Sequence, residues 1–319
     1  MGKKTIVWLI AATALVVAGF IILGGTISMQ KWDFTKLSTV KYETNTYELS
    51  EGFENISIQT NTADIVFVPG DRGSVVCYEQ ENAEHFVAVK DGTLTINIVD
   101  TRKWYEYIGV NWSTPKITVT LPQSEYGALS ISSLTGDVEI PKTFHFTVID
   151  ISENTGNVTN SASSTDAVKI KTSTGDIRVE SISAGTLDLS VSTGKVTVAG
   201  VTCQGDVSIR VTTGRANLTD IRCKNFVSRG DTGNLTLKNV VATEKLSLER
   251  STGNITFDRC DAAEISVKTS TGKVSGSLLT HKVFITHTDT GRVSIPKTVT
   301  GGICEITTDT GNITISVDP

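Results

Sequence analysis

Two aspartates occupy the same place in a Thr-Asp-Thr-Gly motif that occurs twice near the C-terminal end of the chain. Asp289 and Asp309 each stand two residues before a glycine. A repeating fold would stack their carboxylates at the strand spacing of ~4.8 Å, where they could share a calcium ion, since calcium prefers oxygen ligands. The alternative is a solvated corner, because the Gly-Gly-x-Gly-x-Asp motif of calcium-binding rolls is absent.

Cysteine is the second residue type that could bind a metal or cross-link the chain. The five cysteines show no Cys-x-x-Cys pair and no Cys/His cluster by spacing, so a zinc site is not expected. Cys203 and Cys223 each lie nine residues after a Thr-Gly glycine, which predicts Cα atoms ~5 Å apart, within the range that a disulfide spans. The alternative is a ladder of buried thiols.

The densest aromatic stretch outside the N-terminal apolar segment is WYEYIGVNW at residues 104–112. Aromatic side chains dominate many recognition surfaces for proteins and small ligands. We therefore take Trp104, Tyr105, Tyr107 and Trp112 as candidate ligand-binding residues. The alternative is that this loop covers the end of the fold and buries its aromatic side chains.

Catalytic residues are not identifiable in this chain. Glycan-cleaving carboxylate pairs need to be held about 5–10 Å apart in a substrate cleft, and a repeat of near-constant length leaves no inserted loop to build one. The four histidines have no Ser or Cys partner that their spacing identifies. A net charge of −5 and a pI of about 5.5 argue against binding to nucleic acid. We expect no enzyme activity and no cofactor.

The element that would position the two aspartates and the two cysteines is a Thr-Gly repeat. Its glycines recur every 19 or 20 residues, at Gly136, Gly156, Gly175, Gly194, Gly214, Gly233, Gly253, Gly272, Gly291 and Gly311. Glycine reaches positive φ without a Cβ penalty, so each is expected to form a sharp structural turn.

Apolar residues recur at fixed distances from each glycine. The position two residues after it is apolar in every repeat, as is the position seven before it, and six middle repeats add an apolar residue seven after it. This alternation is typical of half-buried strands. It predicts an all-β, parallel β-solenoid of about ten coils over residues 129–319, and the regular spacing disfavours an up-and-down barrel.

The residues before the repeat differ in pattern. Residues 55–67 resemble a coil that lacks the glycine, Asp91-Gly92 is typical of a hairpin turn, and residues 116–121 read as a strand. We expect residues 48–128 to form an N-terminal β cap and residues 28–47 to form a linker.

The first 27 residues contain a long apolar segment. Residues 6–23 carry no charge, and the stretch extends to residue 27, enough to cross a ~30 Å hydrocarbon core as a helix. Lys3 and Lys4 precede it, so the positive-inside rule leaves residues 1–5 in the cytoplasm and the remaining chain outside, in a single-pass cell-membrane protein. The alternative is a cleaved signal peptide.

The serial turns, such as STGDI at 173–177 and STGNI at 251–255, together with DGTL at 91–94 and PKITV at 115–119, resemble a bacterial "putative adhesin" family of β-strand-repeat envelope proteins with a domain of unknown function. The resemblance covers roughly residues 50–317. It implies a cell-envelope protein, and it carries over no catalytic residue.

Three functions are compatible with an anchored solenoid. The first is a non-enzymatic envelope protein whose rigid extracytoplasmic rod serves adhesion by binding a protein or polysaccharide. The second is a self-assembling scaffold, because the chain stops eight residues after its last turn glycine and an open sheet edge can pair with another chain. The third is an envelope-stress sensor that signals through a partner protein.

Overall fold

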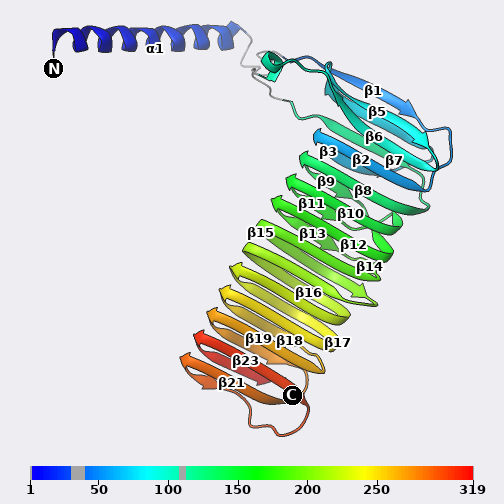
Figure 1. Ribbon diagram of the computed structural model, residues 1–319, viewed down its shortest axis with the longest axis vertical. Coiled ribbons are helices and arrows are strands. Elements are labelled where there is room, and N and C mark those ends of the chain that lie inside the picture. Colours follow the sequence, from blue (N-terminus) through cyan, green and yellow to red (C-terminus); the bar gives the residue numbers. More distant parts are fainter. Residues whose placement is uncertain (1, 30–39, 108–112, 319) are drawn as a thin grey trace.

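The computed structural model describes residues 2–29, 40–107 and 113–318, which form one N-terminal helix and an elongated all-β body (Figure 1). Helix α1 (Lys3–Met29) contains a run of aliphatic and small residues. None of its apolar span, Thr5–Met29, is buried against the body. Its length and composition suffice to cross a membrane, and a signal sequence would have the same properties.

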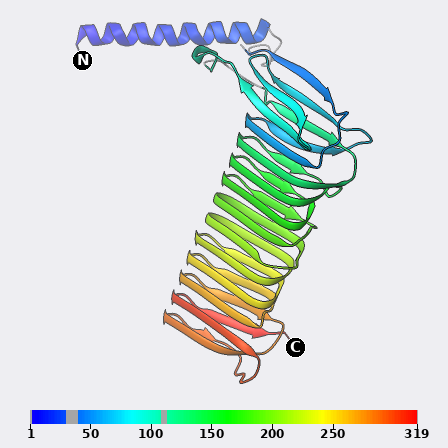
Figure 2. The same ribbon diagram turned by 45° about the vertical axis from the view of Figure 1, so that its right-hand side comes forward.

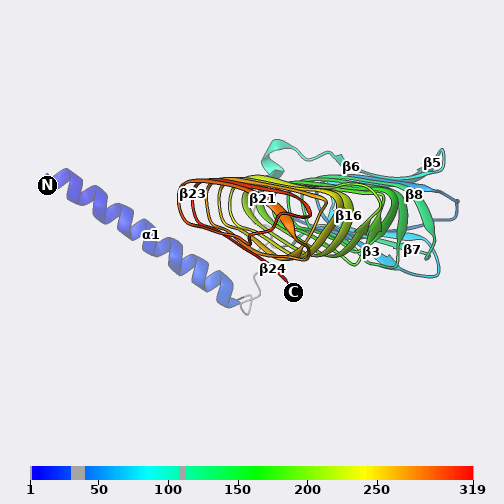
Figure 3. The same cartoon turned by 90° about the horizontal axis from the view of Figure 1, so that it is seen from below.

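The body is a parallel β-solenoid of about ten turns, as predicted (Figures 1 and 2). Each coil runs along a first wall, turns at the glycine corner, returns along a second wall and closes through a short third side. Seen from below, the coils superpose as flattened loops with the two walls facing each other (Figure 3). The core lies between the walls.

The first wall contains β2 (Asn55–Thr62), β8 (Glu125–Thr135), β10 (His145–Thr155), β12 (Ser163–Thr174), β19 (Glu264–Thr271), β21 (Lys282–Thr290) and β23 (Gly302–Thr310). The second wall contains β3 (Asp64–Pro69), β9 (Val138–Ile140), β11 (Val158–Asn160), β13 (Ile177–Glu180), β18 (Ile255–Cys260), β20 (Val274–Leu278), β22 (Val293–Ser294) and β24 (Ile313–Val317). The third side includes β14 (Ser183–Ala184), and three long strands continue through the corners: β15 (Thr186–Cys203), β16 (Val207–Thr232) and β17 (Leu235–Thr252).

Parallel pairing in register turns each repeat position into a column of like side chains. Ile149, for example, pairs with Leu129 in one neighbouring coil and with Val168 in the other, and all three are buried. The apolar residues seven before and two after each glycine are buried through most of the rod. The coil of β21 and β22 is the exception, because its Val293 is 44% exposed. Leu279, expected inside, is also exposed, and its neighbour Leu278 fills that place.

The geometry of the glycine corner explains why Asp or Asn often follows the glycine. At this position the backbone N–H points toward the neighbouring coil, where an Asp or Asn side-chain oxygen accepts it. Asp137 Oδ1 accepts from the N–H of Asn157 at 2.8 Å, Asn157 Oδ1 from Asp176 at 2.9 Å, and Asp176 Oδ1 from Lys195 at 2.8 Å. The Thr-Gly-Asp/Asn motif is therefore a hydrogen-bonded ladder that satisfies the donors of the turn.

The N-terminal cap continues both walls. On the first wall, β6 (Thr93–Asp100) stacks parallel on β2 and pairs antiparallel with β5 (Ala83–Lys90) through the Asp91-Gly92 turn. On the second wall, β7 (Lys116–Leu121) stacks parallel on β3 and pairs antiparallel with β4 (Ser74–Gln80), which also pairs with β1 (Tyr42–Glu48). The last two residues of α1 and all of β1 except Glu48 lie within residues 28–47, which were expected to form the linker.

Coils at both ends are not stacked in chain order. The β2–β3 coil lies between the later β6–β7 coil and the β8–β9 coil. At the other end, β23 pairs with both β19 and β21, and β24 with both β20 and β22. The last coil of the sequence is thus inserted before the preceding one. Strand β24 pairs with β20 along its whole length but with β22 only at Ile313 and Thr314, so residues 315–317 keep one unpaired edge. Among the described residues at this end of the rod, β21 and β22 also pair on one side only.

Candidate functional site

A groove follows the third side of the solenoid, and we call it the edge groove. It consists of two hollows of about 410 and 420 Å³ that share Gln204. It arises where the inward residues of the third side change from large to small. Tyr126 and Phe146 fill the first coils, whereas the equivalent positions in the next two coils hold Ser164 and Ala184.

Strands from seven successive coils bring the lining residues together. The first hollow is lined by Glu125, Tyr126, His145, Phe146, Thr147, Ser163, Ser164, Thr165, Ser183, Ala184, Thr202 and Gln204. The second is lined by Cys203, Gln204, Arg222, Cys223, Lys224, Val241, Thr243 and Glu244.

The chemistry of the edge groove changes along its length. The first hollow combines six Ser and Thr residues with an amide, an imidazole and one carboxylate over a floor that includes Tyr126 and Phe146. The second adds charge, with Lys224 3.5 Å from Glu244 in an exposed ion pair. A mixture of hydroxyls, an amide and aromatic edges suits a hydrogen-bonding ligand of extended shape better than a compact ionic one.

Cys203 and Cys223 form part of the floor of the second hollow. They lie in neighbouring coils, as predicted, and both are free thiols in the structure. Burial raises the pKa of Cys203 to about 11 and that of Cys223 to about 12, so both thiols stay protonated near neutral pH. A disulfide between them stays a prediction.

The other candidates from the sequence lie apart from the edge groove. Trp104 belongs to the 3-10 helix η2 (Trp104–Tyr107) in the cap and is 76% exposed. The side chains of Tyr105 and Tyr107, and the whole of Trp112, lie outside the described residues. A ligand-binding role for this aromatic segment stays a prediction.

Asp289 and Asp309 occupy equivalent positions in the paired strands β21 and β23. Both are exposed, and Asp289 Oδ1 lies 2.9 Å from His287 Nε2. This histidine competes with a cation for the Asp289 carboxylate. Calcium binding by the pair stays a prediction.

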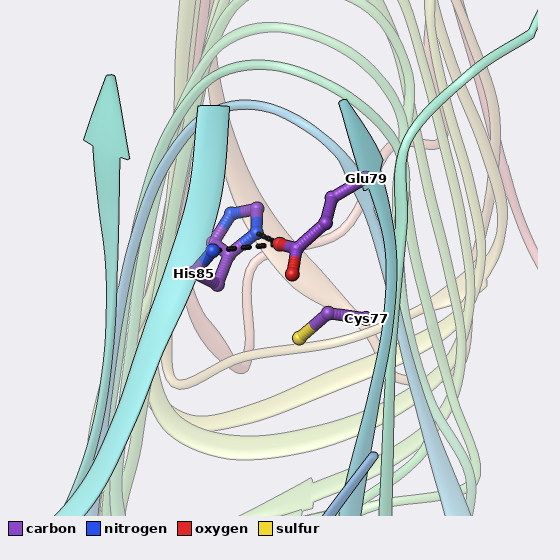
Figure 4. A group of neighbouring side chains, drawn as sticks. All are labelled: Cys77, Glu79 and His85. Carbon is purple, nitrogen blue, oxygen red and sulfur yellow. Dashed lines mark hydrogen bonds and ion pairs between the residues drawn. The ribbon is translucent and has the colours of Figure 1, made fainter. Parts of the chain in front are cut away.

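A buried polar cluster that the sequence analysis missed lies inside the cap (Figure 4). Cys77 and Glu79 are 0% exposed and His85 is 2% exposed, and one potential ligand atom from each lies within 4.8 Å of the others. Within the described parts of the chain, no other group of three His, Cys, Asp or Glu residues meets this criterion. The spacing of cysteines and histidines along the sequence did not indicate this group.

The cluster joins the two layers of the cap. Cys77 and Glu79 alternate on the inward face of β4, while His85 points at them from β5 (Figure 4). A Cys-x-Glu alternation in a strand, followed closely by a His, was the available sequence signal. It could not be interpreted without knowing that β4 and β5 belong to opposite walls.

Hydrogen bonds fix the histidine and the carboxylate. His85 Nδ1 lies 2.6 Å from Glu79 Oε2, and the His85 backbone N–H donates to the same oxygen at 2.6 Å. Asn45 Nδ2 donates to Glu79 Oε1 at 2.8 Å. Burial alone would raise the pKa of Glu79, but the hydrogen bonds from His85 and Asn45 outweigh it and hold this pKa below its usual value.

Thr60 completes a chain of contacts, since its Oγ1 lies 2.9 Å from His85 Nε2. Carboxylate, imidazole and hydroxyl in this order resemble the relay of a serine hydrolase. Thr60 is only 4% exposed, however, and its partners are buried as well. A substrate carbonyl could not reach the hydroxyl, so the arrangement does not support hydrolysis.

Thr60 also begins a column of inward residues three positions before each glycine. Ser133 and Glu153 follow it in the next two coils. Glu153 is 2% exposed and lies beside Ser133 of the neighbouring coil, which is 4% exposed. Burial raises the pKa of Glu153 to about 7.

Comparison with known proteins agrees with this architecture. The family model described as Toastrack DUF4097 matches residues 53–214 and 202–319 of the chain. No curated protein matches it.

Three solved structures illustrate the likeness. A "putative adhesin" from Parabacteroides distasonis ATCC 8503 aligns over 76% of this chain and 98% of its own, at 14% identity and a TM-score of 0.50. A "putative adhesin" from Bacteroides fragilis NCTC 9343 aligns over 86% and 97%, at 19% identity and a TM-score of 0.46. A "putative lipid binding protein" from P. distasonis ATCC 8503 aligns over 75% and 95%, at 18% identity and a TM-score of 0.46. At 14% identity, the likeness to the structure with a TM-score of 0.50 concerns the fold alone.

Proposed function

The chain belongs to the Toastrack DUF4097 family, and from that premise we propose that it is a non-enzymatic envelope protein that binds an extended polysaccharide. In this proposal, α1 anchors the protein in the cell membrane and the solenoid stands outside the cytoplasm. Lys3 and Lys4 before the apolar span support this orientation.

The observation that carries the proposal is the continuity of the edge groove. It crosses strands from the coil of Glu125 to the coil of Val241. Six steps at the strand spacing of ~4.8 Å give it a length of about 29 Å. A long, shallow site repeated coil by coil fits a polymer of repeating units better than a single small molecule.

The residues that line the edge groove favour a neutral sugar polymer as the ligand rather than a highly charged polymer. Hydroxyl and amide groups can both donate and accept hydrogen bonds, and the Ser, Thr and Gln side chains line the first hollow from four adjacent coils. The exposed charges of the second hollow include both signs, because Arg222 and Lys224 are balanced in part by Glu244. A neutral or weakly charged glycan meets no strong repulsion along this path.

A blocking substitution in the groove tests the proposal. Ser183 is exposed and lines the first hollow, so Ser183→Trp should fill part of it. The matched control is Ser152→Trp, at an exposed position on the first wall. The full chain in detergent would be titrated with dextran, chitin oligosaccharides and soluble peptidoglycan fragments.

We expect at least one probe to bind, Ser183→Trp to weaken this binding by about tenfold or more, and Ser152→Trp to leave it unchanged. Equal binding by all three proteins would place the site elsewhere. Loss of binding in Trp104→Ala alone would assign it to the aromatic segment. Failure of every probe to bind would overturn the proposal.

The topology has its own test on intact cells. An external protease should cleave the rod before lysis, and the mature protein should keep its N-terminal segment. A rod that is protected until lysis would contradict an extracytoplasmic location. A mature N-terminus near residues 26–30 would replace the anchor with a cleaved signal peptide.

A second candidate function is self-assembly through the free end of the rod. Strand β21 pairs only with β23 within the described chain, so one of its edges is unpaired. Ile285 and Val293 are 54% and 44% exposed in this coil. An unpaired edge with exposed apolar side chains can add a strand from a second copy. Sedimentation of the full chain in detergent as a monomer at high concentration would exclude this function.

A further inference from the structure

We propose that Cys77, Glu79 and His85 bind a zinc ion inside the N-terminal cap. Their potential ligand atoms lie within 4.8 Å of one another, and all three residues are almost completely buried. The inference concerns the cap alone and does not depend on polysaccharide binding in the edge groove.

The ligand atoms of Cys77, Glu79 and His85 favour zinc over calcium and magnesium. A cysteine sulfur, an imidazole nitrogen and a carboxylate oxygen are the three ligand types that zinc takes in proteins. Calcium and magnesium prefer oxygen ligands throughout, so the sulfur of Cys77 disfavours both ions. The cluster differs in this respect from the exposed Asp289 and Asp309 pair, which offers oxygen only.

The positions of the side chains fit a site that closes around the ion. Zinc–ligand distances of about 2.0–2.3 Å place the ligand atoms of a tetrahedral site roughly 3.3–3.8 Å apart. The His85 Nδ1 to Glu79 Oε2 distance of 2.6 Å would open by about 1 Å as the metal replaces their shared proton. Cys77 points into the same space from the adjacent inward position of β4 (Figure 4).

The surroundings hold the ligands in place. Thr60 Oγ1 lies 2.9 Å from His85 Nε2, the ring nitrogen that does not contact Glu79, and so fixes the orientation of the imidazole. Asn45 holds the second oxygen of Glu79, and the Tyr47 hydroxyl donates to the His85 carbonyl at 3.0 Å. Such outer partners orient metal ligands and tune their affinity.

The ion would act as a structural cross-link. Cys77 and Glu79 belong to the layer formed by β1, β4 and β7, whereas His85 belongs to the layer formed by β5 and β6. Because these layers continue the second and first walls, a zinc ion between them would fix the end of the solenoid that follows α1 in sequence. Binding must displace the thiol proton of Cys77, so the zinc affinity should fall as the pH is lowered.

Metal titration of the full chain in detergent tests the inference. After chelation, the protein would be titrated with Zn²⁺ alone and, separately, with Co²⁺, whose thiolate complexes absorb characteristically. We expect one Zn²⁺ per chain, a higher melting temperature on binding, and a cobalt–thiolate absorption band. Absence of stoichiometric zinc together with an unchanged melting temperature would overturn the proposal.

Two variants locate the site. Cys77→Ser should abolish the cobalt–thiolate band and weaken zinc binding by about 100-fold or more. The control Cys304→Ser removes another buried cysteine, in the solenoid, and should leave both properties intact. Since Cys77→Ser could disturb the cap itself, His85→Gln provides a second ligand variant, with circular dichroism to verify folding. Unchanged zinc binding in both folded ligand variants would refute this site.

Discussion

Gly175 packs directly against the backbone of Gly156 in the neighbouring coil. A Cβ atom added to Gly175 would lie 1.9 Å from the carbonyl oxygen of Gly156, and its φ of 142° is strained for any other residue. The same contact recurs along the corner, down to Gly311 on Gly272 and Gly291 on Gly311. The glycines thus allow close stacking of coils as well as a sharp turn.

We expect Gly175→Ala to destabilise the solenoid by on the order of 3 kcal/mol, because the methyl group meets backbone that cannot move independently. Gly52→Ala is the matched control, since a Cβ at Gly52 meets nothing within 4 Å. Urea unfolding of both variants checks the prediction. Equal stability of Gly175→Ala and the parent chain would contradict the stacking argument.

Removal of the last coil of the sequence, β23 and β24, should also unfold the coil of β21 and β22. Strand β23 is the only strand paired with β21 within the described chain, so truncation after Gly301 leaves residues 282–294 without their neighbour. Hydrogen exchange should show β21 unprotected while β19 and β20 keep their protection. A chain ending at Thr280 should show the same protected residues. Continued protection of β21 after truncation at Gly301 would contradict the inserted order.

Stability should depend on pH through Glu153. Burial raises the pKa of this carboxyl from 4.5 to about 7 in the folded chain. Between these values the folded state keeps a proton that the unfolded state releases, so the contribution to stability is full below about pH 4.5, falls as the pH rises and levels off above about pH 7.

Glu153→Gln should remove this decrease of the unfolding free energy between pH 4.5 and pH 7. The change in unfolding free energy that the substitution causes should therefore be more favourable at pH 8 than at pH 4.5, by on the order of 2 kcal/mol. Glu139→Gln, at an exposed position of β9 on the second wall, is the control and should change little. Urea unfolding at several pH values provides the measurement. A slope that persists in Glu153→Gln would show that another group carries it.

Thiol counting distinguishes the two predicted states of Cys203 and Cys223. All five cysteines are buried free thiols in the structure, and burial raises the pKa of every one of them. We expect slow labelling of the native chain and five labelled thiols after unfolding without reductant. Three labelled thiols would instead demonstrate a disulfide.

The sequence by itself was sufficient to predict the solenoid. Each coil contributes one element to a column, so the side chain that faces the core must be similar in successive repeats, and this similarity is visible as a period of 19 or 20 residues. The apolar α1 segment is equally visible, because a span of this length and composition depends on local sequence alone. The cap was predicted as a β region, although strand β1 was assigned to the linker.

Sites between coils and layers depended on the tertiary structure. The edge groove forms because Ser164 and Ala184 follow Phe146 on one side, a change in size whose effect requires the stacking register. Cys77, Glu79 and His85 meet because β4 and β5 lie in opposite layers. The inserted last coil is likewise invisible in the repeat, since β23 fits equally well on either side of β21 by pattern. Periodicity specifies which side chains face inward, whereas long-range pairing decides which of them become neighbours.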